Sequence, residues 1–347
     1  MSKKRYIAPV FVPHLGCPND CIFCNQKKIT NHKQAVDKKD VIESIESYRR
    51  YFPDQGVERE IAFFGGSFTA IDFDAMVEYL KIAKDYKDKG LIEYIRLSTR
   101  PDAIDLKILD TLKYYGVDII ELGVQSMNDL VLEANNRGHN SKSVYEASKL
   151  IKSYGFTLGH QIMPGLYKDS YDLIMDTAKQ VIAIGPDIVR IYPTLVITNT
   201  RLEALYKAGI YQPLALDEAV EISKELLLLF NQAKIQVIRI GLQPTDNITL
   251  GKDVVAGPFH PSMRSLVEES IYYDILDQAF KDYKILDRDE IEIHVSNSKL
   301  SYVVGNKAIN KEKLRKKYRI KNIKYRGLET ESFYIVLEDK KIELGVV

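Results

Sequence analysis

The chain has 347 residues, 45% of them hydrophobic, which is typical of a globular protein. Its 49 basic and 48 acidic side chains nearly cancel to a formal net charge of +1, so the overall charge identifies no partner. No stretch approaches the ~20 uninterrupted apolar residues of a membrane span, and the charged first residues do not resemble a secretory signal. We therefore expect a cytoplasmic protein that does not enter the membrane.

Short apolar runs alternate with longer amphipathic segments, a pattern that predicts β-strands alternating with α-helices. The predicted strands are 6–12, 61–64, 94–98, 119–124, 156–163 and 188–192. The predicted helices are 39–51, 73–88, 104–115, 142–154, 170–184 and 217–233, and a β-like run follows at 235–240. This alternation indicates βαβ units and a parallel sheet, either an open partial barrel or a doubly wound sheet.

The six predicted strands all end in residues that are unusual for a plain loop. The segments that follow them are the cysteine loop, Gly65-Gly66-Ser67, Ser98-Thr99-Arg100, Gln125-Ser126, Met163-Pro164-Gly165 and Tyr192-Pro193-Thr194. In a barrel these strand ends meet on one rim, where barrel active sites are built.

The last part of the chain differs in texture from the rest. A helix is predicted over 262–283, and we place a domain boundary near residue 286. Beyond it, a strand at 291–295, a helix at 310–318 and β-like runs at 323–325 and 333–337 predict a small α+β domain over 287–347.

The three cysteines form one CxxxCxxC motif, Cys17-Pro-Asn-Asp-Cys21-Ile-Phe-Cys24. Such a tight, odd-numbered cluster argues against disulfides. Three thiolates can bind three corners of a [4Fe–4S] cluster, and without a fourth cysteine one iron has no protein ligand. That iron can bind the amino and carboxylate groups of S-adenosylmethionine (SAM). A zinc site that includes His14, or three buried thiols, are alternatives.

A CxxxCxxC loop after the first strand, with Gly65-Gly66 at the end of the next, resembles the radical SAM superfamily. The resemblance implies a [4Fe–4S] cluster on Cys17, Cys21 and Cys24. It also implies an external low-potential electron donor and cleavage of SAM to a 5′-deoxyadenosyl radical. The fold prediction becomes an α/β incomplete (β/α)6 TIM-like barrel with a small C-terminal α+β domain.

Further motifs, in order along most of residues 5–270, resemble the catalytic subunit of Elongator, which modifies wobble uridines of tRNA. They are Arg100-Pro101-Asp102, Glu121 to Ser126, Arg137-Gly138-His139, His160 to Gly165, Ile191 to Val196, Leu242 to Thr245 and Gly257 to His260. Three features depart from that family: the short gap between the first two cysteines, Arg190 in place of Lys, and only about 60 residues after 286, too few for an acetyl-CoA-binding domain. We expect a relative limited to the radical SAM chemistry.

Residues at the strand ends are the candidates for binding SAM. They are Gly65, Gly66, Ser67, Glu121, Gln125 and Met163. Paired glycines let a ligand approach the backbone, although they also suit a tight turn. Glu121 and Gln125 alternate along one strand and face the same side; a buried Glu121 needs a partner, which is either SAM or an ion pair with Arg100 or Arg190. Arg190 and Tyr192 are the candidate catalytic residues on the substrate side.

Basic residues crowd one segment of the C-terminal domain. They are Lys307, Lys311, Lys313, Arg315, Lys316, Lys317, Arg319, Lys321, Lys324 and Arg326. Such a segment is suited to binding the phosphate backbone of a nucleic acid. The sequence Gly305-Asn306-Lys307-Ala308 is similar to the GxxG loop of KH RNA-binding domains, with Ala in place of the second Gly. A solvated helix face is the alternative interpretation.

The predicted function is a radical SAM enzyme that acts on tRNA or another RNA. A radical SAM oxidase of a small molecule such as a porphyrinogen is an alternative, for which the basic segment would be dispensable. A non-enzymatic RNA-binding protein stabilised by a metal is a second alternative.

Overall fold

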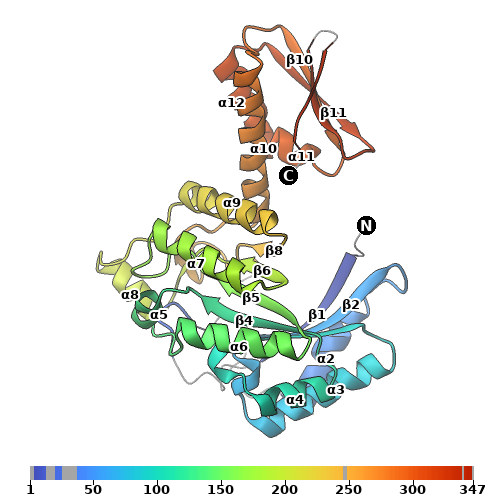
Figure 1. Ribbon diagram of the computed structural model, residues 1–347, viewed down its shortest axis with the longest axis vertical. Coiled ribbons are helices and arrows are strands. Elements are labelled where there is room, and N and C mark those ends of the chain that lie inside the picture. The colour runs from blue at the N-terminus through green and yellow to red at the C-terminus, as the bar shows by residue number, and fades with distance from the viewer. Residues whose placement is uncertain (1–3, 13–19, 26–36, 245–247, 338–339, 346–347) are drawn as a thin grey trace. The chain divides into compact units, whose positions relative to one another are not determined.

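The computed structural model describes residues 4–12, 20–25, 37–244, 248–337 and 340–345. The chain separates into two compact units, which are coloured along the chain in Figure 1. The larger comprises Met1–Ala219 and Leu226–Pro261, and the smaller comprises Val220–Glu225 and Ser262–Val347. In the described part of the chain, no helix has the length and apolar character needed to cross a bilayer.

The larger unit is built on a parallel sheet of seven strands that curls into a half-barrel. Its strands are β1 (Lys4–Val12), β2 (Val57–Gly65), β3 (Tyr94–Thr99), β4 (Ile119–Gln125), β5 (Thr157–Ile162), β6 (Ile188–Ile191) and β8 (Gln236–Ile240), which lie side by side in that order. The six predicted strands and the predicted barrel class are confirmed. The β-like run after the sixth helix is the seventh strand and pairs with β6.

Helices connect successive strands of the sheet, as Figure 1 shows. They are α2 (Lys38–Arg49), α3 (Phe73–Asp88), α4 (Leu106–Tyr114), α5 (Asp129–Ala134), α6 (Ser141–Ser153), α7 (Tyr171–Ile184), α8 (Arg201–Lys207) and α9 (Leu216–Gln232), with 3₁₀ turns at Phe68–Ala70 and Pro101–Ala103. Side-chain oxygens at helix starts accept backbone N–H bonds: Asp37 forms a capping box with Asp40 on α2, and Asn140 caps α6. The short helices α5 and α8 were not predicted, because one or two turns leave too little periodicity in the sequence.

The two faces of the sheet differ in polarity. On β1, Ala8, Val10 and Val12 are buried, whereas Phe11, which points to the opposite face, is 37% exposed. Ser44 of α2 donates a hydrogen bond of 2.9 Å to the β1 backbone, so α2 packs on this strand. The opposite, inner face carries the polar residues described below. A separate antiparallel pair joins β7 (Val196–Ile197) and β9 (Val254–Ala256).

The smaller unit packs helices against a four-stranded sheet of order β11-β10-β12-β13. Its elements are α10 (Met263–Asp282), β10 (Glu290–Ser296), α11 (Leu300–Val304), a 3₁₀ turn at Asn306–Ala308, α12 (Ile309–Tyr318), β11 (Asn322–Leu328), β12 (Phe333–Leu337) and β13 (Lys340–Glu343). Tyr272, Leu276 and Phe280 of α10 lie in one buried core with Ile293 and Phe333 of the sheet. For this reason α10 belongs to the smaller unit, and the units divide near residue 261 rather than near the predicted 286.

Candidate active site

The carboxyl ends of β1 and β2 lie next to each other. Val12 is the register partner of Gly65, and the Gly66 N–H donates a hydrogen bond of 3.0 Å to the Val12 carbonyl. Gly65 has a φ of +101°, a conformation that residues with a Cβ rarely adopt. The segment with the cysteine motif follows Val12 in the sequence.

Ser67 is buried at the turn that follows β2. Its hydroxyl lies 2.8 Å from the Thr99 hydroxyl and accepts a hydrogen bond of 3.1 Å from the Arg100 N–H. These bonds tie the turn to the end of β3. The Ser67 hydroxyl thus has hydrogen-bond partners within the protein. Its contact with SAM stays a prediction.

Two of the three predicted metal ligands, Cys21 and Cys24, lie in the described residues, whereas Cys17 and His14 lie outside them. The Cys24 N–H donates a hydrogen bond of 3.0 Å to the Cys21 carbonyl, which makes a tight turn. Cys21 is buried, and Ile22 and Phe23 pack in an apolar cluster to which Met163 also contributes. The loop thus carries two thiols with an apolar side, as a shielded cluster requires.

The cysteine loop is fastened to two segments far away in the sequence. The Ile22 N–H donates to the Asn135 carbonyl at 3.2 Å, and the Asn136 amide donates to the Asp20 carbonyl at 2.7 Å. On the other side, the Leu202 N–H donates to the Ile22 carbonyl at 2.7 Å. The loop is therefore positioned by the turn after α5 and by the start of α8.

Arg137 is a site residue that the sequence reasoning quoted only within a motif. Its Nη1 donates a hydrogen bond of 3.2 Å to Cys21 Sγ. Its charge and burial also affect the next motif residue, His139, because burial first and the Arg137 charge second lower the pKa of that imidazole to about 3. The available signal was the motif Arg137-Gly138-His139 itself, which is among those that resemble the Elongator family.

Glu121 lies between two arginines on the inner face of the sheet. It forms ion pairs with Arg96 and, at 2.9 Å, with Arg190. Arg96 in turn bonds Glu60 at 2.6 Å, so the charges alternate across the strands. Of the ion pairs considered as alternatives to SAM, the structure contains the one with Arg190, while Arg100 instead forms a bidentate pair with Asp102. A contact between Glu121 and SAM stays a prediction.

The two predicted catalytic residues contact each other. Arg190 Nη1 donates a hydrogen bond of 3.1 Å to the Tyr192 hydroxyl, and the guanidinium lies 5.6 Å from the centre of the Phe64 ring. Arg239 of β8 is the register partner of Arg190. Burial, followed by repulsion from Arg190, lowers the pKa of Arg239. Sequence reasoning missed Arg239 because it had not placed β8 in the sheet.

Gln125 and Met163 meet where β4 and β5 end. Gln125 has a φ of +68°, its carbonyl accepts a hydrogen bond of 2.9 Å from the Met163 N–H, and its side chain accepts one of 3.2 Å from Gln161. The neighbour His160 points to the opposite face, where its ring bonds the Ser148 hydroxyl of α6 at 2.9 Å. His160 and Gln161, which are neighbours on β5, therefore point to opposite faces of the sheet.

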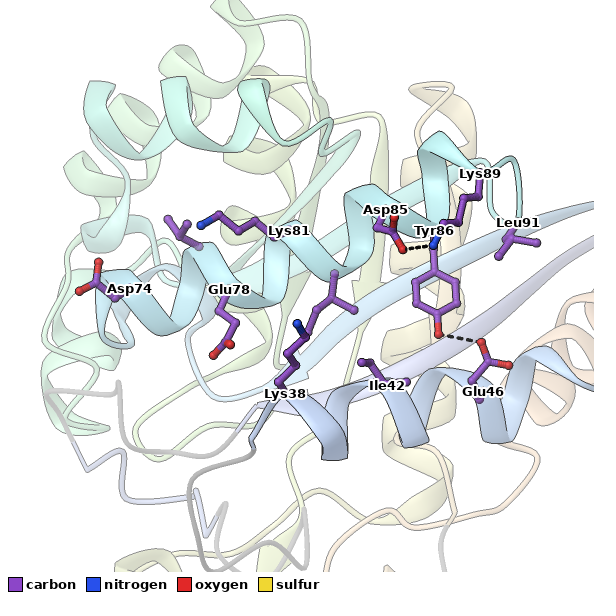
Figure 2. Close-up of a pocket in the computed structure, with 12 residues that line it drawn as sticks. Lys38, Ile42, Glu46, Asp74, Glu78, Lys81, Asp85, Tyr86, Lys89 and Leu91 are labelled. Atoms are coloured by element: carbon purple, nitrogen blue, oxygen red, sulfur yellow. Dashed lines mark hydrogen bonds and ion pairs between the residues drawn. The ribbon is translucent and has the colours of Figure 1, made fainter.

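A groove between α2 and α3 is separate from this rim. Figure 2 shows its lining, in which Ile42 and Tyr86 lie among acidic and basic side chains of the two helices. The Tyr86 hydroxyl donates a hydrogen bond of 2.7 Å to Glu46, and burial together with this bond raises the pKa of Tyr86 to about 12. The groove lies among outer helices and holds none of the predicted site residues.

The donor set on the rim suits an iron–sulfur cluster. Cys21 and Cys24 supply soft thiolate ligands, and the Arg137 N–H group aimed at Cys21 Sγ complements an anionic, iron-bound sulfur. These observations match the [4Fe–4S] cluster that the sequence resemblance implies.

Comparisons with known families and proteins agree with this geometry. The radical SAM superfamily matches residues 11–181, and the radical SAM C-terminal domain matches residues 186–273. An uncharacterized protein of Methanocaldococcus jannaschii is 31% identical over 226 residues, which are 61% of this chain and 69% of that protein. The structure of Elp3 from Methanocaldococcus infernus, with an N-terminal deletion, superposes with a TM-score of 0.62 at 20% identity, over 84% of this chain and 66% of that one.

Other relatives have longer chains. The tRNA uridine(34) acetyltransferase of Methanocaldococcus infernus is 28% identical over 47% of this chain, and Elongator complex protein 3 of Homo sapiens is 33% identical over 42% of it. The matches cover 34% and 28% of those proteins, so this chain spans about a third of their length. Members of the superfamily use a [4Fe–4S] cluster and SAM. The chain belongs to the radical SAM superfamily.

Proposed function

We propose that this protein is a radical SAM enzyme of the cytoplasm that abstracts a hydrogen atom from a nucleoside of tRNA. The observation that carries the chemistry is the Cys21–Cys24 loop, which is fastened to Asn135 and Asn136 beside the polar rim of the sheet. The tRNA part rests on relatives that are named tRNA uridine(34) acetyltransferases. Acyl transfer is not part of the proposal.

Each predicted site residue has a role in this proposal. Cys17, Cys21 and Cys24 hold the cluster, and an external low-potential donor supplies the electron. Bound there, the cluster and SAM supply one-electron chemistry that generates a 5′-deoxyadenosyl radical. The residues that bind and orient SAM are Gly65, Gly66, Ser67, Glu121, Gln125 and Met163.

Arg190 and Tyr192 face the substrate in this proposal, with Arg239 beside them. Glu121 neutralises Arg190, whereas no carboxylate among the described residues forms an ion pair with Arg239. The site therefore has an excess of positive charge at the end of β6 and β8. Guanidinium groups bind phosphate in a bidentate manner, so this end of the site suits the backbone of an RNA.

In the basic segment of the smaller unit, fewer cations are free to bind phosphate than the sequence indicates. Six of its cations form ion pairs with carboxylates. These are Arg315, Lys317, Arg319, Lys321, Lys324 and Arg326. Within the residues that the structure describes, the other four, Lys307, Lys311, Lys313 and Lys316, form no such ion pair. Lys307 lies in the 3₁₀ turn between α11 and α12, and Lys311 lies in the first turn of α12.

This loop has a fixed conformation. Gly305 has a φ of +79°, and a Cβ there would lie 2.8 Å from a side-chain carbon of Ile309. The Asn310 amide donates to the Glu269 carbonyl at 2.9 Å and to the Tyr302 carbonyl at 3.2 Å, which ties α12 to α10 and α11. We propose that the exposed Lys307 and the adjacent Lys311 contact the RNA backbone here, in the manner of a GxxG-type loop.

The enzymatic part is tested by anaerobic reconstitution with iron and sulfide, followed by SAM and dithionite. We expect 5′-deoxyadenosine from the wild type and none from Cys21→Ala or Cys24→Ala. The tRNA part is tested by comparing modified nucleosides in total tRNA with and without the gene. An unchanged nucleoside profile contradicts the tRNA assignment, and zinc in place of an iron–sulfur cluster contradicts the enzyme.

The RNA contact is tested by the salt dependence of tRNA affinity. Lys307→Gln combined with Lys311→Gln should weaken binding and reduce the slope of log K against log salt by about 2. The matched control combines Lys284→Gln with Lys340→Gln, which removes two exposed lysines elsewhere in the same unit. Equal slopes for both double variants would show that the loop does not bind RNA.

A further inference from the structure

A buried arginine is aimed at one of the cluster ligands. Arg137 Nη1 donates a hydrogen bond of 3.2 Å to Cys21 Sγ, and Nη2 donates one of 2.7 Å to the Gly123 carbonyl. The side chain is buried, and its Nε has no hydrogen-bond partner in the described residues. No carboxylate among the residues that the structure describes forms an ion pair with Arg137. A full positive charge is therefore buried with a cysteine sulfur among its few acceptors.

Burial of an unpaired guanidinium is costly, so its retention needs a compensating negative charge. A neutral thiol compensates little because it is a weak acceptor. A thiolate bound to iron carries negative charge and forms a stronger, charge-assisted hydrogen bond. The position of Arg137 thus fits a loaded cluster better than a free cysteine.

The surrounding contacts fix Arg137 in this orientation. Its N–H donates to the Leu132 carbonyl at 3.0 Å, and its carbonyl accepts a hydrogen bond of 2.5 Å from Arg100 Nη2. At Gly123, a Cβ would lie 3.3 Å from Arg137 Nη2, so glycine leaves room for the guanidinium. The preceding residue, Asn136, bonds the backbone of Asp20 in the cysteine loop itself. One short turn therefore both positions the loop and places a cation against it.

We propose that Arg137 is a positioning residue that raises the reduction potential of the cluster. The inference rests on the proposed function, since it requires a cluster on Cys21. In the step concerned, one electron passes from the external low-potential donor to the cluster, and the donor is oxidised by one electron. Reduction adds a negative charge, which the Arg137 guanidinium and its hydrogen bond to the ligand sulfur stabilise.

The test is a redox titration of the reconstituted protein without SAM, followed by the EPR signal of the reduced cluster. At the wild-type midpoint potential, Arg137→Met should contain at least tenfold less reduced relative to oxidised cluster, a shift of about 59 mV to more negative potential. Arg137→Gln, which keeps an N–H donor but loses the charge, should shift less. Arg137→Lys, which keeps the charge, should lie nearest to the wild type.

Lys149→Met is the matched control, since it removes an exposed cation from α6 of the same unit and solvent screens that charge. If Arg137→Met assembles no cluster, Arg137→Gln and Arg137→Lys are compared, and equal potentials for these two and the wild type overturn the inference. Unchanged potentials with weaker SAM binding also overturn it and assign Arg137 to the cofactor. If the wild type holds no [4Fe–4S] cluster, the proposed function itself fails.

Discussion

The Glu121 carboxylate and the Arg190 guanidinium form an ion pair at 2.9 Å, between strands that are not adjacent in the sheet. Their side chains are only 5% and 13% exposed, and Arg96 contacts the same carboxylate from the other side. The neighbouring Glu121 outweighs burial, which alone would lower the pKa of Arg190, and keeps that pKa raised. Glu121 therefore compensates two buried cations at once.

Replacement of Glu121 by Gln should strongly destabilise the larger unit. Because the change leaves two buried guanidinium groups without their shared carboxylate, we expect the free energy of unfolding to fall by about 3–5 kcal/mol. Urea denaturation followed by circular dichroism measures this. The control is Glu58→Gln, whose partner Arg5 and own side chain are 31% and 27% exposed, and which should cost about 1 kcal/mol or less. Similar losses for both variants would contradict the role of Glu121.

Tyr192→Phe should separate substrate chemistry from SAM cleavage. The change removes the hydroxyl that accepts the 3.1 Å hydrogen bond from Arg190 but leaves the Arg190–Glu121 pair in place. We expect the rate of SAM cleavage without substrate to stay within about twofold of wild type. RNA modification per SAM cleaved should fall about tenfold, because the variant loses one hydrogen bond of ordinary strength. Chromatography of 5′-deoxyadenosine and of digested tRNA gives both rates. Parallel loss of the two activities would place Tyr192 on the SAM side.

Local periodicity was sufficient to predict the strands, because each has a buried outer face and a polar or half-exposed inner face. It also indicated that a buried Glu121 needs a partner, which was either SAM or an ion pair with Arg100 or Arg190. The full set of partners of Glu121 could be identified only from the register of the strands. Ser98 is opposite Glu121, so Arg96, two residues earlier on β3, reaches the carboxylate. Arg100, which was the other candidate, is occupied by Asp102.

The hydrogen bonds that position the cysteine loop could not be predicted from the sequence, for a different reason. The bonds from Ile22 to Asn135 and from Asn136 to Asp20 join segments more than a hundred residues apart, and both segments are irregular. Irregular backbone has no periodicity from which pairing could be predicted. The placement of Arg137 against Cys21 depends on that docking and could be found only in three dimensions.

Gly159→Ala should disturb the same ion-pair network by crowding. A Cβ at Gly159 would lie 2.8 Å from Glu121 Cγ and 3.1 Å from a side-chain carbon of Ile188, both in a buried region. We expect a loss of about 1–3 kcal/mol in the free energy of unfolding, as for overpacked cores. Gly345→Ala is the control, since nothing lies within 4 Å of its Cβ position. It should change stability by no more than about 0.5 kcal/mol. Both are measured by urea denaturation, and equal effects would refute the crowding argument.

The buried His160 should make the protein less stable in mild acid. Burial first, with a smaller contribution from Lys152, lowers the pKa of His160 to about 3. Below pH 6.5 the imidazole of His160 is protonated in the unfolded chain but stays neutral in the folded protein. The stability that is present above pH 6.5 is therefore lost as the pH falls toward 3. Between pH 7 and pH 5 this loss is about 2 kcal/mol.

His160→Gln removes the titrating group, so the difference in unfolding free energy between pH 7 and pH 5 should shrink by that amount. Ser148→Ala is the matched control, because it deletes the 2.9 Å hydrogen bond to the ring without removing the imidazole. It should lower stability at both pH values and leave most of the difference intact. Urea denaturation of the three proteins at the two pH values provides the comparison. If His160→Gln shows the same pH difference as the wild type, the imidazole is not the source of the acid sensitivity.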